Sequence, residues 1–172
     1  DAWISNQTSA TATYGDINTW DVSQITDFSH LFYQRAFNSD ISNWDVSNGT
    51  NFNEMFSNVA GFNQDIGSWD VSNGSDFRWM FSSAASFDQD LSGWNIDSDD
   101  KLTLMFDGAA FMQANQGVSS TPSVDYFSPK VRDVSASTKD GSYKEGDSIA
   151  INVAFSKVIT VETINGTPTL EL

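Results

Sequence analysis

The residues whose chemistry could serve a function are mainly aspartates that recur at a fixed spacing. One column holds Asp16, Asp40, Asp65 and Asp90, and a second holds Asp21, Asp45 and Asp70, with Asn95 in the fourth place. If the copies stack about 5 Å apart, neighbouring carboxylates repel by about 0.8 kcal/mol even at the dielectric constant of water. Hydrogen bonds from turn N–H groups would offset this repulsion. The alternative is bound calcium, with Asp40, Asp65 and Asp90 as ligands.

A separate acidic cluster lies near the C-terminal end of the chain and contains Asp140, Glu145 and Asp147. Their oxygen atoms are the ligands that calcium prefers, so this cluster is a second candidate calcium site, at a junction between modules. The glycine-rich nonapeptide of calcium-binding β-helices is absent from the chain, which argues against calcium. Calcium is the only cofactor that the sequence suggests.

Aromatic and basic side chains gather around one position of the repeat. That position, just before the second core residue of each predicted helix, holds His30, Glu54, Trp79 and Leu104. Arg78 precedes Trp79, and Tyr33 and Arg35 follow His30. Because aromatic residues and arginine are favoured as interface anchors, these positions predict a ligand-binding surface. Its predicted members are Trp79, Arg78, His30, Tyr33 and Arg35, the alternative being aromatic residues that are exposed without a role.

No group of residues predicts catalysis. His30 is the only histidine, the chain has no cysteine, and no motif places a nucleophile or a carboxylate pair beside His30. We therefore expect a protein that is not an enzyme.

Charge restricts the partners. The chain carries 23 acidic residues against 8 lysines and arginines, so nucleic acid and anionic membrane surfaces are not expected to bind. Residues 1 to 112 hold 16 of the acids and 3 of the bases. No run of about 18 apolar residues occurs, so no membrane insertion is expected within this chain.

A seven-residue pattern centred on tryptophan recurs four times, at Trp20, Trp44, Trp69 and Trp94, in steps of 24, 25 and 25 residues. Each copy continues with apolar residues at i, i+3 and i+4, as at Phe52, Met55 and Phe56. This spacing predicts a short amphipathic helix, extended by alanine at i+8 in Ala60, Ala85 and Ala110. Phe37, Phe62 and Phe87 add one further core position per copy.

The Ile-x-x-Trp-x-Val half of each copy matches the apolar skeleton of leucine-rich repeats. Neither half can bury its apolar face alone, so the copies must stack and place their tryptophans in one interior column. We predict an α/β solenoid, leucine-rich-repeat-like, with one short strand and one short helix per repeat, followed by a partial all-β Ig-like segment. The expected divisions are an N-terminal cap (1–14), a four-repeat solenoid (15–112), a linker (113–129) and the Ig-like segment (130–172).

The repeats resemble a known family, the 25-residue BspA-like or DUF285 repeats of bacterial surface proteins. Asn63-Gln64-Asp65-Ile66 and Trp69-Asp70-Val71-Ser72-Asn73 carry the resemblance, which departs from the family pattern at Gly49 and Gly74. The resemblance implies a leucine-rich-repeat-like fold, an extracellular location and a role in adhesion. The expected partner is a protein or glycan on another surface. The alternative is a structural spacer in a long adhesin stalk, without a ligand of its own.

From Pro129 the pattern changes to alternating strands, as in Ile149, Ile151, Val153 and Phe155. Together with Gly146-Asp147 and Gly166-Thr167-Pro168, these residues resemble the start of the Ig-like repeats of bacterial adhesins. An Ig-like sandwich needs about 100 residues, so we expect a truncated domain. Its open strand edges predict self-association.

Overall fold

The computed structural model describes residues 2–127, 131–136 and 151–155. The chain divides into two compact units, Asp1–Ser128 and Pro129–Leu172. The first contains the helices α1 (Ala2–Ser5), α2 (Gln7–Tyr14) and α3 (Ala110–Asn115) and the 3-10 helices η1 (Ile17–Thr19), η2 (Asp99–Lys101) and η3 (Val124–Phe127). The second contains the strands β1 (Val131–Ala136) and β2 (Ile151–Phe155).

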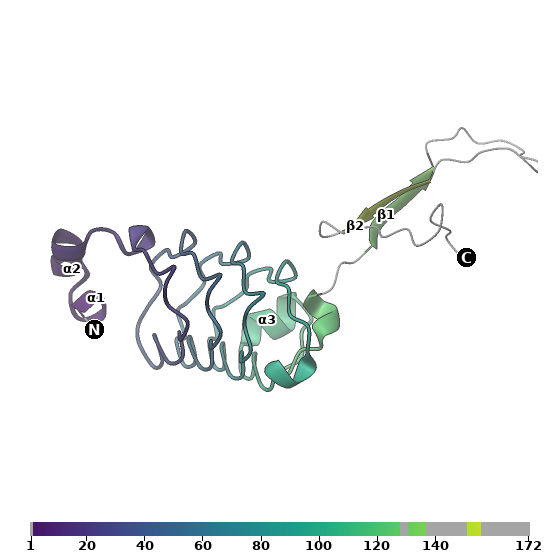
Figure 1. The fold of residues 1–172 in the computed structure, drawn as a ribbon. Helices are drawn as coiled ribbons and strands as arrows, with labels where there is room; N and C mark the ends of the chain where they lie inside the picture. The colour runs from purple at the N-terminus through teal and green to yellow at the C-terminus, as the bar shows by residue number, and fades with distance from the viewer. Residues whose placement is uncertain (1, 128–130, 137–150, 156–172) are drawn as a thin grey trace, which may run out of the picture. The chain divides into compact units, whose positions relative to one another are not determined.

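The four repeats form coils that lie side by side, as Figure 1 shows. Backbone hydrogen bonds join each coil to the next at equivalent positions. The N–H of Phe28 donates to Asn51 O at 2.8 Å, and that of Phe52 donates to Asp76 O at 2.8 Å. Isolated parallel bridges join Asp27 to Asn51 and Asn51 to Asp76. The repeats therefore share one backbone ladder that runs along the stack.

The prediction of a helix in each repeat is wrong, because the described repeats contain consecutive tight turns at those positions. Two residues per repeat have left-handed backbone angles, as at Glu54 (φ 53°) and Asn58 (φ 59°), which interrupt an α-helix. The N–H groups of Glu54, Phe56 and Asn58 donate to the neighbouring coil, and those of Met55 and Ser57 donate to carbonyls three residues back, so none donates to a carbonyl four residues back as in an α-helix. Ala60, Ala85 and Ala110 are consequently exposed, and the residues just before them are buried: Val59, Ala84 and Ala109.

The expected strand in each repeat is also absent from the described part of the stack. In the second repeat, the N–H of Trp44 donates to Ile41 O at 3.1 Å, which closes a turn within the run that was expected to be extended. The third and fourth repeats contain the same turn, with Trp69 and Trp94 as donors. The apolar skeleton of the motif is therefore buried through turns rather than through a strand.

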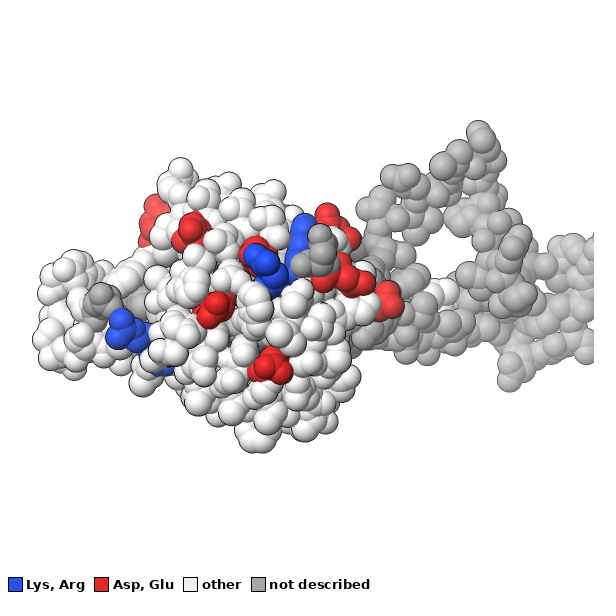
Figure 2. Space-filling view, turned by 90° about the horizontal axis from the view of Figure 1, so that it is seen from below, with Lys and Arg blue, Asp and Glu red and all other residues white. Residues whose placement is uncertain are grey.

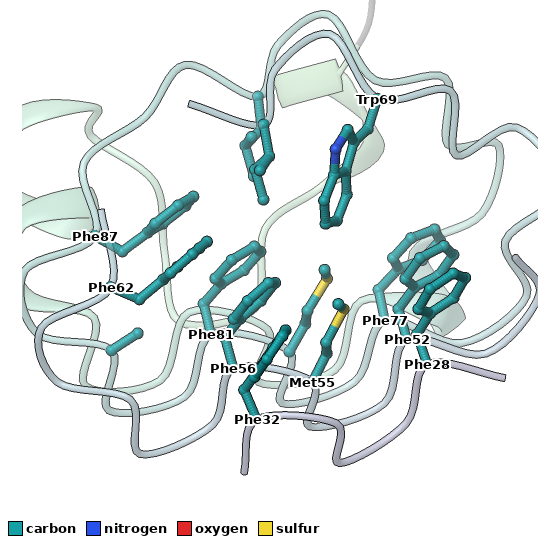
Figure 3. Close-up of a cluster of buried hydrophobic side chains, with 14 of the residues drawn as sticks. Phe28, Phe32, Phe52, Met55, Phe56, Phe62, Trp69, Phe77, Phe81 and Phe87 are labelled. Carbon is teal, nitrogen blue, oxygen red and sulfur yellow. The ribbon is translucent and has the colours of Figure 1, made fainter. Parts of the chain in front are cut away.

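Phenylalanine rings form columns through the interior of the stack, as Figure 3 shows. In one column, Phe52 lies between Phe28 and Phe77, with ring centroids 5.4 and 5.3 Å apart and nearly parallel planes. A second column consists of Phe32, Phe56, Phe81 and Phe106, and a third of Phe37, Phe62 and Phe87. Equivalent residues thus meet across repeats at separations typical of aromatic pairs.

Tryptophan side chains join successive repeats by hydrogen bonds. The indole N–H of Trp44 donates to Ile17 O at 2.7 Å, and Trp69 and Trp94 donate to the equivalent carbonyls of Ile41 and Ile66. These three side chains are buried. Each one therefore fills the core of its own repeat and satisfies a backbone acceptor of the preceding repeat.

The segment expected to be a linker packs on the fourth repeat instead. Val118 and Phe127 are buried, and the N–H of Phe106 continues the ladder by donating to Ser120 O at 2.9 Å. The ring of Tyr126 meets that of Phe106 edge to face. These contacts cover the C-terminal end of the stack, because the apolar core of the fourth repeat must be shielded from water.

In the second unit, β1 and β2 pair antiparallel, with Val134 opposite Val153 and Ala136 opposite Ile151. The register shifts between Val131 and Asp133, which marks a bulge. The remainder of the expected Ig-like segment lies outside the described residues. Among the helices that the structure describes, none is long and apolar enough to cross a membrane.

Candidate functional site

A groove of about 990 Å³ lies at the N-terminal end of the stack, between α1 and α2 on one side and the first repeat on the other. Figure 1 shows both helices at that end. We call it the N-terminal groove. The residues that define it here are Trp3, Tyr14, Trp20, Ile25, Leu31 and Tyr33.

The groove exists because the described residues before the first repeat form α1 and α2 rather than a coil that covers its core face. Leu31 is 47% exposed, whereas Met55, Met80 and Met105, at the same repeat position, have no exposed surface. Ile25 is 41% exposed in the place that Gly49 and Gly74 take in the next two repeats. Leu31, at a position that is core in the other repeats, and Ile25, at a position that is a buried glycine in the next two, therefore line the groove.

Residues of α1 and α2 cover only part of this end. The indole N–H of Trp3 donates to Ser39 Oγ at 3.0 Å, and its ring meets that of Trp20 edge to face at 5.7 Å. Trp20 donates in turn to the carbonyl of Tyr14 at 3.1 Å. Tyr14 itself is 62% exposed. The helices are thus held at one side of the groove and leave its apolar wall accessible.

Three of the five predicted ligand-binding residues, His30, Tyr33 and Arg35, line this groove. The rings of His30 and Tyr33 meet edge to face at 5.6 Å. His30 Nε2 lies 3.5 Å from Glu54 Oε1 in the second repeat. The groove therefore has an apolar wall and a rim that carries hydrogen-bonding and basic groups.

Arg78 and Trp79 lie in the third repeat and do not line the groove. The guanidinium of Arg78 contacts the ring of Trp79 at 5.8 Å and donates to both carboxylate oxygens of Asp76, at 2.9 and 2.6 Å. Burial raises the pKa of Asp76, but the hydrogen bonds from Arg78 outweigh it and hold that pKa below its usual value. Arg78 is thus committed to an ion pair within its own repeat.

The aspartates of the first column act as turn acceptors. Oδ1 of Asp40, Asp65 and Asp90 accepts the N–H of the residue two positions later, at 2.9, 3.0 and 2.9 Å. These bonds are the ones expected if turn N–H groups, rather than calcium, offset the repulsion between the carboxylates. Within the residues described here, no group of three or more metal-binding side chains is placed to hold an ion. Asp40, Asp65 and Asp90 therefore do not form such a group, and Asp140, Glu145 and Asp147 lie outside the described residues.

The second aspartate column forms similar turns. Ser23 donates to Asp21 Oδ1 through both its hydroxyl and its N–H, and Ser47 does the same for Asp45. The serine hydroxyls, followed by the N–H groups, lower the pKa of Asp21 and Asp45. Figure 2 shows acidic and basic side chains scattered over one face rather than a continuous acidic surface. The aspartates of this column therefore take part in turns of their own repeats.

Sequence reasoning missed the apolar residues of the groove. Trp20 and Leu31 follow the repeat pattern, so they were expected in the shared core. The available signal was their place in the first copy, because only a first copy lacks a neighbour on that side. Tyr14 and Trp3 belong to no repeat, and their position depends on how α1 and α2 pack.

The comparisons with known proteins identify the family alone. No curated protein and no solved structure matches the chain. The model of the family described as "Mycoplasma protein of unknown function, DUF285" matches residues 4–119, which include all four repeats, the second half of α1 and all of α2. The chain therefore belongs to the DUF285 family.

Proposed function

We propose that this protein is a non-enzymatic binding module and that the N-terminal groove holds its ligand, a protein or a glycan on another surface. The observation that carries the proposal is the exposure of Leu31 at a position that is fully buried in the other three repeats. A ligand in the groove would cover this side chain and Ile25.

Physical considerations support a groove that binds. Its volume of about 990 Å³ is at the upper end of the range of ligand pockets. Covering apolar surface is worth about 25 cal/mol per Å². The polar rim at His30 and Tyr33 could orient a ligand, as a few polar groups commonly do in apolar pockets.

The finer family assignment is also a proposal. We propose a BspA-like, leucine-rich-repeat-like solenoid that is displayed outside the bacterial cell for adhesion. The ladder between coils and the Asn63-Gln64-Asp65-Ile66 motif support it. We further propose that residues 130–172 begin an Ig-like domain. The antiparallel pairing of β1 with β2 supports this, since Ig-like sheets are antiparallel.

The test is a parallel screen of the full chain against a glycan array and a library of linear peptides. Leu31→Glu places a charge in the groove, and Phe111→Glu is the matched control, because Phe111 is 53% exposed in α3, beyond the fourth repeat. We expect ligands whose binding is lost with Leu31→Glu and kept with Phe111→Glu. Circular dichroism of both variants would verify that they fold.

Two outcomes would contradict the proposal. Silence in both screens would favour the structural spacer, which needs no ligand. Ligands that bind both variants equally would place the binding surface elsewhere, for example at Trp79.

A further inference from the structure

The backbone ladder has a direction. In each of the first three repeats, the N–H groups of alternate residues donate toward the following repeat: His30 to Asn53 O, Glu54 to Arg78 O and Trp79 to Thr103 O, at 3.0 to 3.1 Å. In these repeats the same pattern holds two and four residues later. Each coil therefore presents acceptors toward the N-terminal side of the stack and donors toward the C-terminal side.

At the C-terminal end, the segment after the fourth repeat satisfies two of the equivalent donors. Phe106 N–H donates to Ser120 O at 2.9 Å, and Leu104 N–H donates to Thr121 Oγ1 at 2.8 Å. The segment that follows the fourth repeat thus takes the place of a fifth coil. It shows that a non-repeat segment of chain can complete this ladder.

At the N-terminal end the equivalent acceptors are the carbonyls of Asp27, Ser29, Leu31 and Tyr33. They correspond to those of Asn51, Asn53, Met55 and Ser57, each of which accepts an N–H from the first repeat. Within residues 2–127, no N–H or side chain donates to these four first-repeat carbonyls. The first repeat has the same left-handed angles as the others, 55° at His30 and 56° at Gln34, so its carbonyls face the same way.

We infer that the N-terminal groove binds a linear peptide of a partner protein, which pairs its main-chain N–H groups with the carbonyls of Leu31 and Tyr33 and places an apolar side chain against Leu31. This inference rests on the proposed function and names its ligand class. Two independent features coincide: Leu31 and Tyr33 line the groove, and both belong to the open edge of the ladder. An open edge is a template for main-chain pairing, and side-chain pockets beside it give specificity.

The chemistry of the edge favours a peptide over the other occupants. The acceptors come from every second residue of the coil, and in an extended peptide every second N–H group faces the same side. The hydroxyl groups of a sugar do not repeat at this spacing. A second copy of this chain would present the same acceptors at its N-terminal end, and two rows of acceptors do not pair. At its C-terminal end, the donors of Leu104 and Phe106 are already used.

The experiment selects peptides of about nine residues, displayed on phage, against the full chain and repeats the selection against Leu31→Glu, with Phe111→Glu as the control. Each selected peptide is then synthesised with one main-chain N-methyl group at each position in turn. N-methylation removes a single donor and leaves every side chain intact. We expect losses of about tenfold in affinity at alternate positions and much smaller losses between them.

The outcomes separate the two proposals. Alternating losses in a peptide that Leu31→Glu abolishes would establish the pairing. Losses without alternation would overturn the main-chain pairing and leave binding at the groove intact. The same conclusion would follow if a glycan required Leu31 for binding and no peptide did. If nothing binds at the groove, both proposals fail.

Discussion

The indole N–H of Trp69 donates to the carbonyl oxygen of Ile41, in the preceding repeat, at 3.2 Å. Both side chains are buried. The same bond joins Trp44 to Ile17 and Trp94 to Ile66. One side chain per repeat thus supplies core volume and also a hydrogen bond that fixes the distance to its neighbour. This double use explains why tryptophan stands at the centre of the motif rather than another large apolar residue.

Trp69→Phe should therefore lower the free energy of unfolding by about 1–3 kcal/mol, because it leaves the buried carbonyl of Ile41 without its donor. Some further loss should follow from the smaller ring. The measurement is urea denaturation followed by circular dichroism. Trp20→Phe is the matched control: Trp20 is half-buried and its acceptor belongs to the exposed Tyr14, which water can reach. Equal losses in the two variants would show that the hydrogen bond contributes little.

The sequence was sufficient to find the core but not its backbone conformation. The spacing of Phe52, Met55 and Phe56 fits a helix as well as it fits the turns that are present, because both place these side chains on one side. The left-handed angles decide between them. They fall on Asn58, a residue type that favours this conformation, but also on Glu54, a residue type that rarely adopts it. Only the hydrogen bonds to the next coil, which are absent from an isolated repeat, make these turns stable.

Only part of the candidate site could be predicted from the sequence, because the groove depends on how separate segments pack. The sequence predicts His30, Tyr33 and Arg35 as binding residues because they are aromatic or basic, and they line the N-terminal groove. The same criterion predicts Trp79 and Arg78, which do not line it. Residue type thus indicates which side chains could bind a ligand, but it does not show which of them meet in space.

Gly74→Ala should destabilise the protein by about 1–3 kcal/mol through overpacking. A Cβ at Gly74 would lie 2.1 Å from the ring of Phe77, which is fully buried and stacked on Phe52 and cannot move aside. Gly61→Ala is the control, because a Cβ there meets nothing within 4 Å. That change should raise stability by about 0.4–1 kcal/mol through the unfolded state. Thermal melting of both variants would reveal the opposite signs, and a shared sign would contradict the packing argument.

Leu31 and Met80 occupy the same repeat position but should respond differently to truncation. Met80→Ala removes a side chain without exposed surface and should cost about 2–5 kcal/mol. Leu31→Ala should cost less than about 1 kcal/mol, because nearly half of that side chain already contacts water. Denaturant titration of the two variants tests the openness of the groove. A loss at Leu31 as large as that at Met80 would mean that the groove is closed in solution.

Asp65 distinguishes a turn acceptor from a calcium ligand. Asp65→Asn keeps an oxygen that can accept the N–H of Gly67 and removes one charge from an acidic column, so the melting temperature should stay the same or rise slightly. Asp65→Ala removes the acceptor and should cost about 0.5–1.5 kcal/mol. Melting is measured for each variant with calcium and with a chelator. A calcium-dependent stabilisation that Asp65→Asn abolishes would restore the metal interpretation.

Tyr126 should make stability depend on pH at the alkaline end. Burial raises the pKa of its hydroxyl to about 12 from an ordinary 10.0, although the N–H of Leu91, which donates to its oxygen at 3.3 Å, opposes that rise. The unfolded chain therefore releases this proton first, and the contribution of Tyr126 is complete below about pH 10 and lost between about pH 10 and 12. Tyr126→Phe should remove this part of the decline while other groups continue to titrate. We expect the free energy of unfolding, measured from about pH 8 to about pH 12, to fall more steeply for the wild type than for the variant. Parallel curves would mean that the hydroxyl is as well solvated in the folded protein as in the unfolded chain.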